Sequence, residues 1–118
     1  MATKLLVNII KAEGILAKDK GGTSDPFAEV RMGKQIKKTK VVQKTLTPEW
    51  NELIVLDISP QDITFDVVLY DHDKGLLLGS STEFLGSVTI PLSTVREGDP
   101  ISEWFDLEYN RKYQKKSE

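Results

Sequence analysis

Apolar residues recur at every second position over short runs of this chain, and turn-forming residues separate the runs. Leu5, Val7 and Ile9 form one such series, and Ala28, Val30 and Met32 form another after Pro26. A period of two places the apolar side chains on one face of a β-strand. Further strands are expected at residues 35–44, 53–58, 63–70, 84–91 and 104–107, and a short helical turn is expected at 93–97.

This pattern of seven or eight short strands with regular turns indicates an all-β sandwich. Stretches with the helical period of 3.6 are rare, which excludes a helical bundle and disfavours a βαβ fold. The 118 residues fit one domain, long enough to bury a core without disulfides, and the chain has no cysteine. We expect a domain at 1–110, followed at 111–118 by a short last strand or a disordered polar tail.

The apolar stretch near the start of the chain is short. It covers Leu5 to Val7 and is interrupted by Asn8 and Lys11, so it is too short for a signal segment or a membrane span. We therefore expect a cytoplasmic protein whose contact with membranes is peripheral.

Charge is distributed unevenly, although the net charge is only −2. Residues 31–48 contain six basic residues and no acid, whereas residues 57–73 contain five aspartates and no lysine or arginine. Such asymmetry favours a basic flank and an acidic site, although charge runs are more often an ordinary solvated surface.

Aspartates are concentrated in two expected loops. The first loop contains Asp19 and Asp25, and the second contains Asp71 and Asp73. Calcium takes six to eight oxygen ligands, mostly carboxylates and carbonyls, so two acidic loops at one end of a sandwich could bind it. Aspartate is also a common turn residue, which leaves a purely structural role open. An EF-hand loop starting at Asp71 is excluded, because Leu76 and Thr82 stand where glycine and glutamate are required.

Several segments, in order along the chain, resemble the C2 domain family. They are Gly21-Gly22-Thr23-Ser24-Asp25-Pro26-Phe27, Lys38-Thr39-Lys40-Val41, Thr47-Pro48-Glu49-Trp50-Asn51-Glu52, Leu69-Tyr70-Asp71-His72-Asp73, Glu83-Phe84-Leu85-Gly86 and Trp104-Phe105-Asp106-Leu107. The resemblance implies an eight-stranded antiparallel Greek-key β-sandwich with calcium loops at one end. It favours the topology whose extra strand lies at the C-terminus.

The resemblance also implies a calcium site for two or three ions. Its implied ligands are the side chains of Asp19, Asp25, Asp71, Asp73 and Glu83 and the main-chain carbonyls near Lys18 and His72. Glu83 replaces the aspartate that is usual there, and the segment from Lys74 to Thr82 is longer than usual. Five ionised carboxylates carry −5, so two calcium ions leave −1 and three leave +1. Calcium would thereby switch the loops from repelling anionic phospholipid to binding it.

Two further groups are candidate membrane contacts. Leu76, Leu77 and Leu78 lie in the second acidic loop and are expected to insert into the membrane, unless they fold back as a small apolar cluster. Lys34, Lys37, Lys38 and Lys40 are expected to contact lipid headgroups such as phosphatidylserine, unless they form a solvated strand face. Trp50 and Trp104 are both expected to be packing residues.

The sequence therefore favours a peripheral module that binds anionic phospholipid membranes when calcium rises and is recruited to their inner face. The alternative is a calcium-independent module that binds proteins or phosphoinositides. An enzyme is not expected, because the chain offers no serine–histidine pair, thiol or phosphate-binding loop. Nucleic acid is not an expected partner, because the chain is slightly acidic and lacks interleaved aromatic residues.

Overall fold

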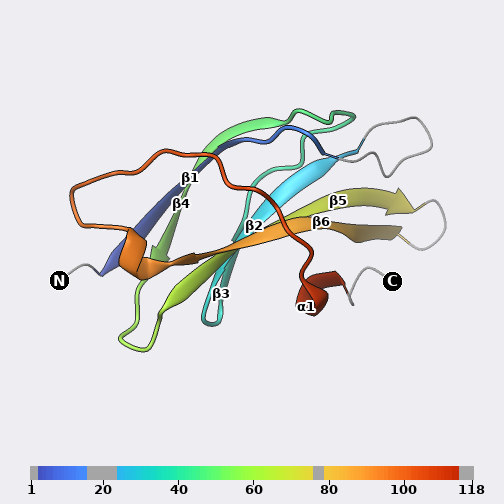
Figure 1. Ribbon diagram of the computed structural model, residues 1–118. Coiled ribbons are helices and arrows are strands. Elements are labelled where there is room, and N and C mark those ends of the chain that lie inside the picture. Colours follow the sequence, from blue (N-terminus) through green and yellow to red (C-terminus); the bar gives the residue numbers. More distant parts are fainter. Residues whose placement is uncertain (1–2, 16–23, 76–78, 115–118) are drawn as a thin grey trace.

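Two antiparallel sheets pack face to face in the computed structural model, which describes residues 3–15, 24–75 and 79–114 (Figure 1). One sheet has the order β1–β4 and the other the order β3–β2–β5–β6. The strands are β1 (Lys4–Lys11), β2 (Pro26–Met32), β3 (Gln35–Lys38), β4 (Glu49–Asp57), β5 (Thr64–Gly75) and β6 (Gly79–Pro91). The predicted all-β antiparallel class is confirmed. The described residues contain six strands, so the eight-stranded topology stays a prediction.

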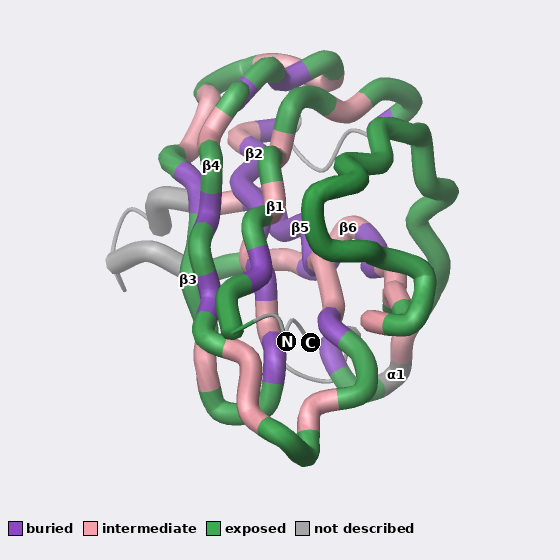
Figure 2. The backbone as a smooth tube through the Cα atoms, turned by 90° about the vertical axis from the view of Figure 1, so that its left-hand side faces the viewer, coloured by how far each residue is buried: buried purple, intermediate pink, exposed green. Residues whose placement is uncertain are grey.

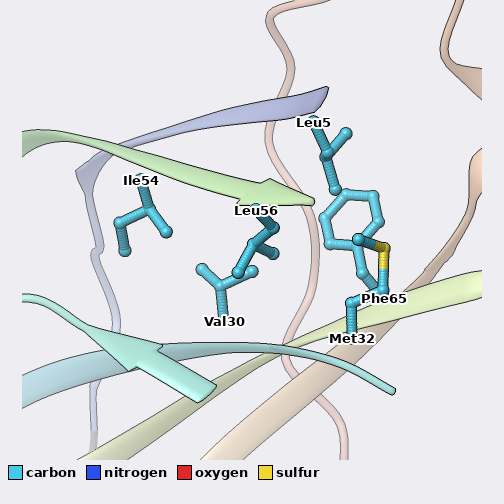
Figure 3. Packing of buried hydrophobic residues seen from close by; sticks show 6 residues of the cluster. All are labelled: Leu5, Val30, Met32, Ile54, Leu56 and Phe65. Atoms are coloured by element: carbon cyan, nitrogen blue, oxygen red, sulfur yellow. The ribbon is translucent and has the colours of Figure 1, made fainter. Parts of the chain in front are cut away.

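The main core lies between the two sheets. Leu5 of β1 and Ile54 and Leu56 of β4 face Val30 and Met32 of β2 and Phe65 of β5 (Figure 3). All six side chains are at most 6% exposed. The period of two predicted which residues of β1 and β2 point inward, because successive side chains of a strand alternate between its two faces.

Trp50 anchors a second part of the core beside Ile15, Ala28 and Leu69. Its indole is 4% exposed, and its Nε1 donates a hydrogen bond to the carbonyl of Lys40 at 3.0 Å. The packing role expected for Trp50 is confirmed. Trp104 is 62% exposed and contacts the ammonium of Lys11, so the packing role expected for Trp104 is wrong.

Strand β3 ends at Lys38, earlier than the expected strand at residues 35–44. The Thr39 side chain gives the reason, because its hydroxyl accepts a hydrogen bond from the Ala28 N–H at 3.0 Å. A side chain thus replaces the main-chain carbonyl that would continue the ladder. The chain then leaves the regular register, although the Val42 N–H still reaches the Pro26 carbonyl at 3.0 Å.

The C-terminal part differs most from expectation. Residues 104–107 form no strand, and the chain instead makes an isolated bridge between Ser87 and Glu108. Gly86 permits this approach, because a Cβ on it would lie 2.7 Å from the Cβ of Leu107. The expected helical turn is a 3-10 helix at Leu92–Thr94.

Residues Arg111–Gln114 form a helical turn, α1, where a short last strand or a disordered polar tail was expected. Asn110 starts it, because its side-chain oxygen accepts from the Lys112 N–H at 3.0 Å and its carbonyl accepts from the Tyr113 N–H at 3.0 Å. Helix α1 lies on the side of the four-stranded sheet that faces away from β1 and β4 (Figure 1).

Strands β5 and β6 continue well past the point where a loop was expected. Their register runs from Thr64 opposite Pro91 to Gly75 opposite Gly79, with one irregularity after Leu69. Asp71 and Asp73 therefore lie in a strand rather than in a loop. The additional length between Lys74 and Thr82 goes into the two arms of a β-hairpin.

Candidate functional site

Three of the residues that carry candidate carboxylates lie at one end of the sandwich. Asp71 of β5 lies directly opposite Pro26 of β2 and opposite Glu83 of β6. Directly paired residues of an antiparallel sheet have Cβ atoms about 4.5–5.5 Å apart. The Asp25 N–H donates a hydrogen bond to Oδ1 of Asp71 at 2.7 Å. Residues 46 positions apart in the sequence are thus brought into contact.

Asp71 is the most deeply buried of these acids, with 1% of its surface exposed. A buried carboxylate is costly unless hydrogen bonds compensate the lost water, and the Asp25 N–H supplies one such bond. Asp25 and Glu83 are half-buried.

Asp25 is fixed by the main chain on two sides. Its carbonyl accepts from the His72 N–H at 2.9 Å, and its Oδ1 accepts from the Lys44 N–H at 2.7 Å. These bonds join the start of β2 to β5 and to the segment that follows β3. The position of the Asp25 carboxylate is therefore set by the fold rather than by its own rotamer preference.

Other predicted site residues, both calcium ligands and membrane-inserting leucines, are described in part or not at all. Lys18, Asp19 and the three leucines Leu76, Leu77 and Leu78 lie outside the described residues. The main chain of Asp73 pairs with Ser81, two residues beyond Asp71. Within the described part of the chain, no three His, Cys, Asp or Glu side chains form a group that could hold a metal ion.

The donor chemistry of this end nevertheless fits calcium. Carboxylate and carbonyl oxygens are the ligands that calcium prefers, and Asp25, Asp71 and Glu83 supply carboxylates there. The imidazole of His72 packs edge-on against the Phe27 ring, with the ring centroids 6.3 Å apart. His72 therefore contributes to packing through its ring, which leaves the oxygen donors as the chemical character of the site.

The four predicted headgroup lysines are all exposed, but they do not share one face. The ammonium of Lys37 donates to the Val55 carbonyl at 2.8 Å, beside the edge of β4. The ammonium of Lys38 lies 5.9 Å from the centroid of the Phe27 ring, on the outer face of the four-stranded sheet. Neighbours in a strand point to opposite faces, so the lysine run is split between two surfaces.

Sequence reasoning missed a cluster on that outer face. Tyr113 of α1, fully buried, packs with Phe27, Val68, Tyr70 and Phe84. The polar and charged surroundings of Tyr113 in the sequence led us to expect a strand or a disordered tail. The only available signal was an isolated aromatic residue among basic ones, and such a residue gives no periodicity to detect.

The described residues include no helix long and apolar enough to cross a membrane. A family model described as "C2 domain" matches residues 3–107. Synaptotagmin-2 of Homo sapiens is 37% identical over 117 residues, which cover 94% of this chain and 27% of that protein. Multiple C2 and transmembrane domain-containing protein 1 of Homo sapiens is 38% identical over 95 residues, or 80% of this chain and 9% of that protein.

Solved structures give the same picture. The calcium-bound C2A and C2B domains of Extended-Synaptotagmin 2 superpose with a TM-score of 0.75 at 30% identity, covering 90% of this chain and 40% of that one. The RIM C2A domain from Drosophila has a TM-score of 0.73 at 24% identity, which shows the fold alone. The chain thus spans a small part of the curated relatives it matches, and the activities of those whole proteins do not transfer to it directly.

Proposed function

Because this chain belongs to the C2 domain family, we propose that it is a peripheral membrane-binding module whose docking onto anionic phospholipid requires calcium. The C2 relatives favour binding of membranes or lipids in general. The calcium requirement is proposed from the acidic end of the sandwich. A binding role is also favoured over an enzymatic one, because the relatives compared above include a synaptotagmin and a multiple-C2 protein.

One observation carries the proposal: buried Asp71 accepts a hydrogen bond from the Asp25 main chain and lies opposite Glu83. Three acids from β5, β6 and the residue before β2 are thereby held at one end of the sandwich, and a bound cation there would offset their negative charge. The cross-strand position of Glu83 supports it as the acid that replaces the usual aspartate.

We assign the calcium ligands as Asp19, Asp25, Asp71, Asp73 and Glu83, with carbonyls near Lys18 and His72. Bound calcium supplies positive charge and coordination positions for phosphate oxygens. The chain itself holds the carboxylates in place through the Asp25 main-chain contacts and keeps the pairing of β5 with β6. The result is a change of surface potential without a change of fold.

Two groups extend this proposed membrane contact. Leu76, Leu77 and Leu78 connect the arms of the β5–β6 hairpin, and their insertion would add apolar burial to the ionic contact. Lys34, Lys38 and Lys40 are exposed and would attract an anionic leaflet, each by about 1 kcal/mol. We propose phosphatidylserine-containing inner leaflets as the target, reached from the cytoplasm when calcium rises.

The exposed lysines also favour the alternative function, calcium-independent binding of phosphoinositides or proteins. One measurement distinguishes the two functions. Calorimetric titration of calcium into the whole chain is expected to show saturable heat, two or three ions bound, and no matching heat for magnesium, because magnesium requires near-ideal octahedral geometry and gives up its water reluctantly. A flat titration, together with an unchanged melting temperature in calcium, would leave only the alternative.

A further inference from the structure

The outer face of the four-stranded sheet forms a pocket for one tyrosine side chain, and Tyr113 occupies it. The Tyr113 hydroxyl donates a hydrogen bond to Oδ2 of Asp66 on β5. Its ring stacks on Phe84 of β6 with centroids 6.2 Å apart and planes 27° apart. The Arg31 guanidinium of β2 lies 5.0 Å from the ring centroid. The hydroxyl and the ring thus meet partners on three different strands.

The strands build this pocket without help from α1. Asp66 also accepts from the Thr89 hydroxyl at 2.7 Å, which orients its carboxylate. Arg31 is held by two hydrogen bonds to Glu29, at 2.9 and 2.6 Å. Binding is favoured when the receiving groups are already fixed, because less side-chain entropy is lost.

The polar end of the pocket selects a neutral phenol. Burial, followed by the hydrogen bond to Asp66, raises the pKa of Tyr113. A raised pKa keeps the hydroxyl protonated throughout the physiological range, so it remains a donor to the carboxylate. A phosphate on the same oxygen would instead place negative charge against Asp66, which disfavours phosphotyrosine.

The occupant is weakly tethered to the rest of the fold. Helix α1 has four residues, too few for a helix to be stable on its own. Its start relies on Asn110, and residues 93–109 are exposed along their whole length (Figure 2). Lys112 is exposed, while Tyr113 next to it is 0% exposed. The tyrosine therefore provides the buried anchor, and only the short stretch that follows the bridge between Ser87 and Glu108 would have to move away from the sheet with it.

We infer that this outer-face pocket is a docking site for a protein segment that presents an unphosphorylated tyrosine directly preceded by a basic residue, and that Tyr113 is its intramolecular competitor. The basic residue follows from Lys112, whose ammonium lies 5.2 Å over the Tyr113 ring and would be replaced by its equivalent in the partner. A cavity of about 270 Å³, lined in part by Arg31, Thr64 and Lys112, leaves room beside the ring for flanking residues. This site does not depend on the proposed calcium site.

The test uses a synthetic peptide with the sequence of residues 110–114, titrated into the whole chain and into Tyr113→Ala. Amide NMR spectra report binding at Phe84 and Asp66. The peptide is expected to saturate Tyr113→Ala, and the wild type is expected to need at least roughly 10-fold more peptide, because a tethered competitor acts at high effective concentration. Peptides with alanine or phosphotyrosine at the tyrosine position are expected not to saturate either protein.

Two results would overturn the inference. One is a folded Tyr113→Ala variant that does not bind the peptide, and the other is equal peptide affinity in the wild type and in Tyr113→Ala. If Tyr113→Ala does not fold, Tyr113→Phe serves as the host, since it keeps the ring and loses only the hydroxyl bond to Asp66. Its peptide affinity is then expected to exceed that of the wild type, and an affinity equal to the wild type would contradict competition. Adding Asp66→Asn to either host should weaken binding of the peptide without unfolding the sheet.

Discussion

Replacing Asp71 and Asp73 by asparagine is expected to abolish calcium-dependent binding to phosphatidylserine vesicles. The double variant removes two of the five proposed carboxylate charges. Mutation of residues that only support metal ligands costs about 10–100-fold in affinity, so loss of two ligands should cost more than roughly 100-fold. The fold should survive, because asparagine at position 71 keeps an oxygen that accepts from the Asp25 N–H.

The matched control is Asp99→Asn together with Asp106→Asn. Both aspartates are exposed and lie outside the acidic end of the sandwich, so the net charge changes equally while the proposed ligands stay. Calcium calorimetry and vesicle co-sedimentation of both double variants measure the effect. Equal loss in both would show that overall charge matters and that the acidic end is not a ligand site.

Replacing Trp50 by alanine is expected to destabilise the fold by about 3–5 kcal/mol, the usual cost of removing a buried aromatic side chain. Trp50 is 4% exposed and packs with Ile15, Ala28 and Leu69. The substitution also removes the donor to the Lys40 carbonyl. A loss of this size is a large share of the stability of a small domain, which is about 5–15 kcal/mol. Urea unfolding followed by circular dichroism measures it.

Trp104→Ala is the matched control, since the same side chain is 62% exposed there. Its contact with Lys11 is an exposed cation–π pair, which contributes about 0.5–1 kcal/mol. The difference between the two variants should therefore be several-fold. Similar losses at the two positions would mean that the segment around Trp104 packs more tightly than its exposure indicates.

The fold was largely predictable where apolar alternation was strong. Leu5, Val30 and Met32 were placed correctly on inner faces because a strand alternates whatever its neighbours are. Strand ends were less predictable. β3 stops because the Thr39 hydroxyl reaches Ala28, and β5 continues because β6 pairs with it as far as Gly75. Both depend on a partner strand that the local sequence does not reveal.

The candidate site was predictable in composition and less so in arrangement. Sequence order singled out Asp25, Asp71 and Glu83, yet only the pairing of β5 with β2 and β6 shows that they lie at the same end of the sandwich. The outer-face pocket was not predictable. Arg31, Asp66, Phe84 and Tyr113 come from four elements, and Tyr113 stands in a segment whose composition is that of a tail. Long-range packing without periodicity leaves no trace that one sequence can show.

The two surfaces give this domain separate proposed roles. The acidic end of the sandwich would respond to calcium and lipid. The tyrosine pocket is filled from α1, which lies on the side of the four-stranded sheet away from β1 and β4, and would respond to a protein segment. The tyrosine pocket depends on Asp66 and Arg31, whereas the acidic end of the sandwich depends on Asp25 and Asp71. Variants can therefore disable one surface and leave the other intact. Tyr113→Ala should therefore bind vesicles as the wild type does.

The most direct test of the central claim is co-sedimentation of the wild-type chain with phosphatidylserine vesicles, in calcium and in chelator. We expect the chain to pellet with the vesicles in calcium and to stay in the supernatant in chelator, because only bound calcium reverses the repulsion between the acidic end of the sandwich and the lipid. Equal pelleting in both buffers, or none in either, would contradict calcium-dependent membrane docking.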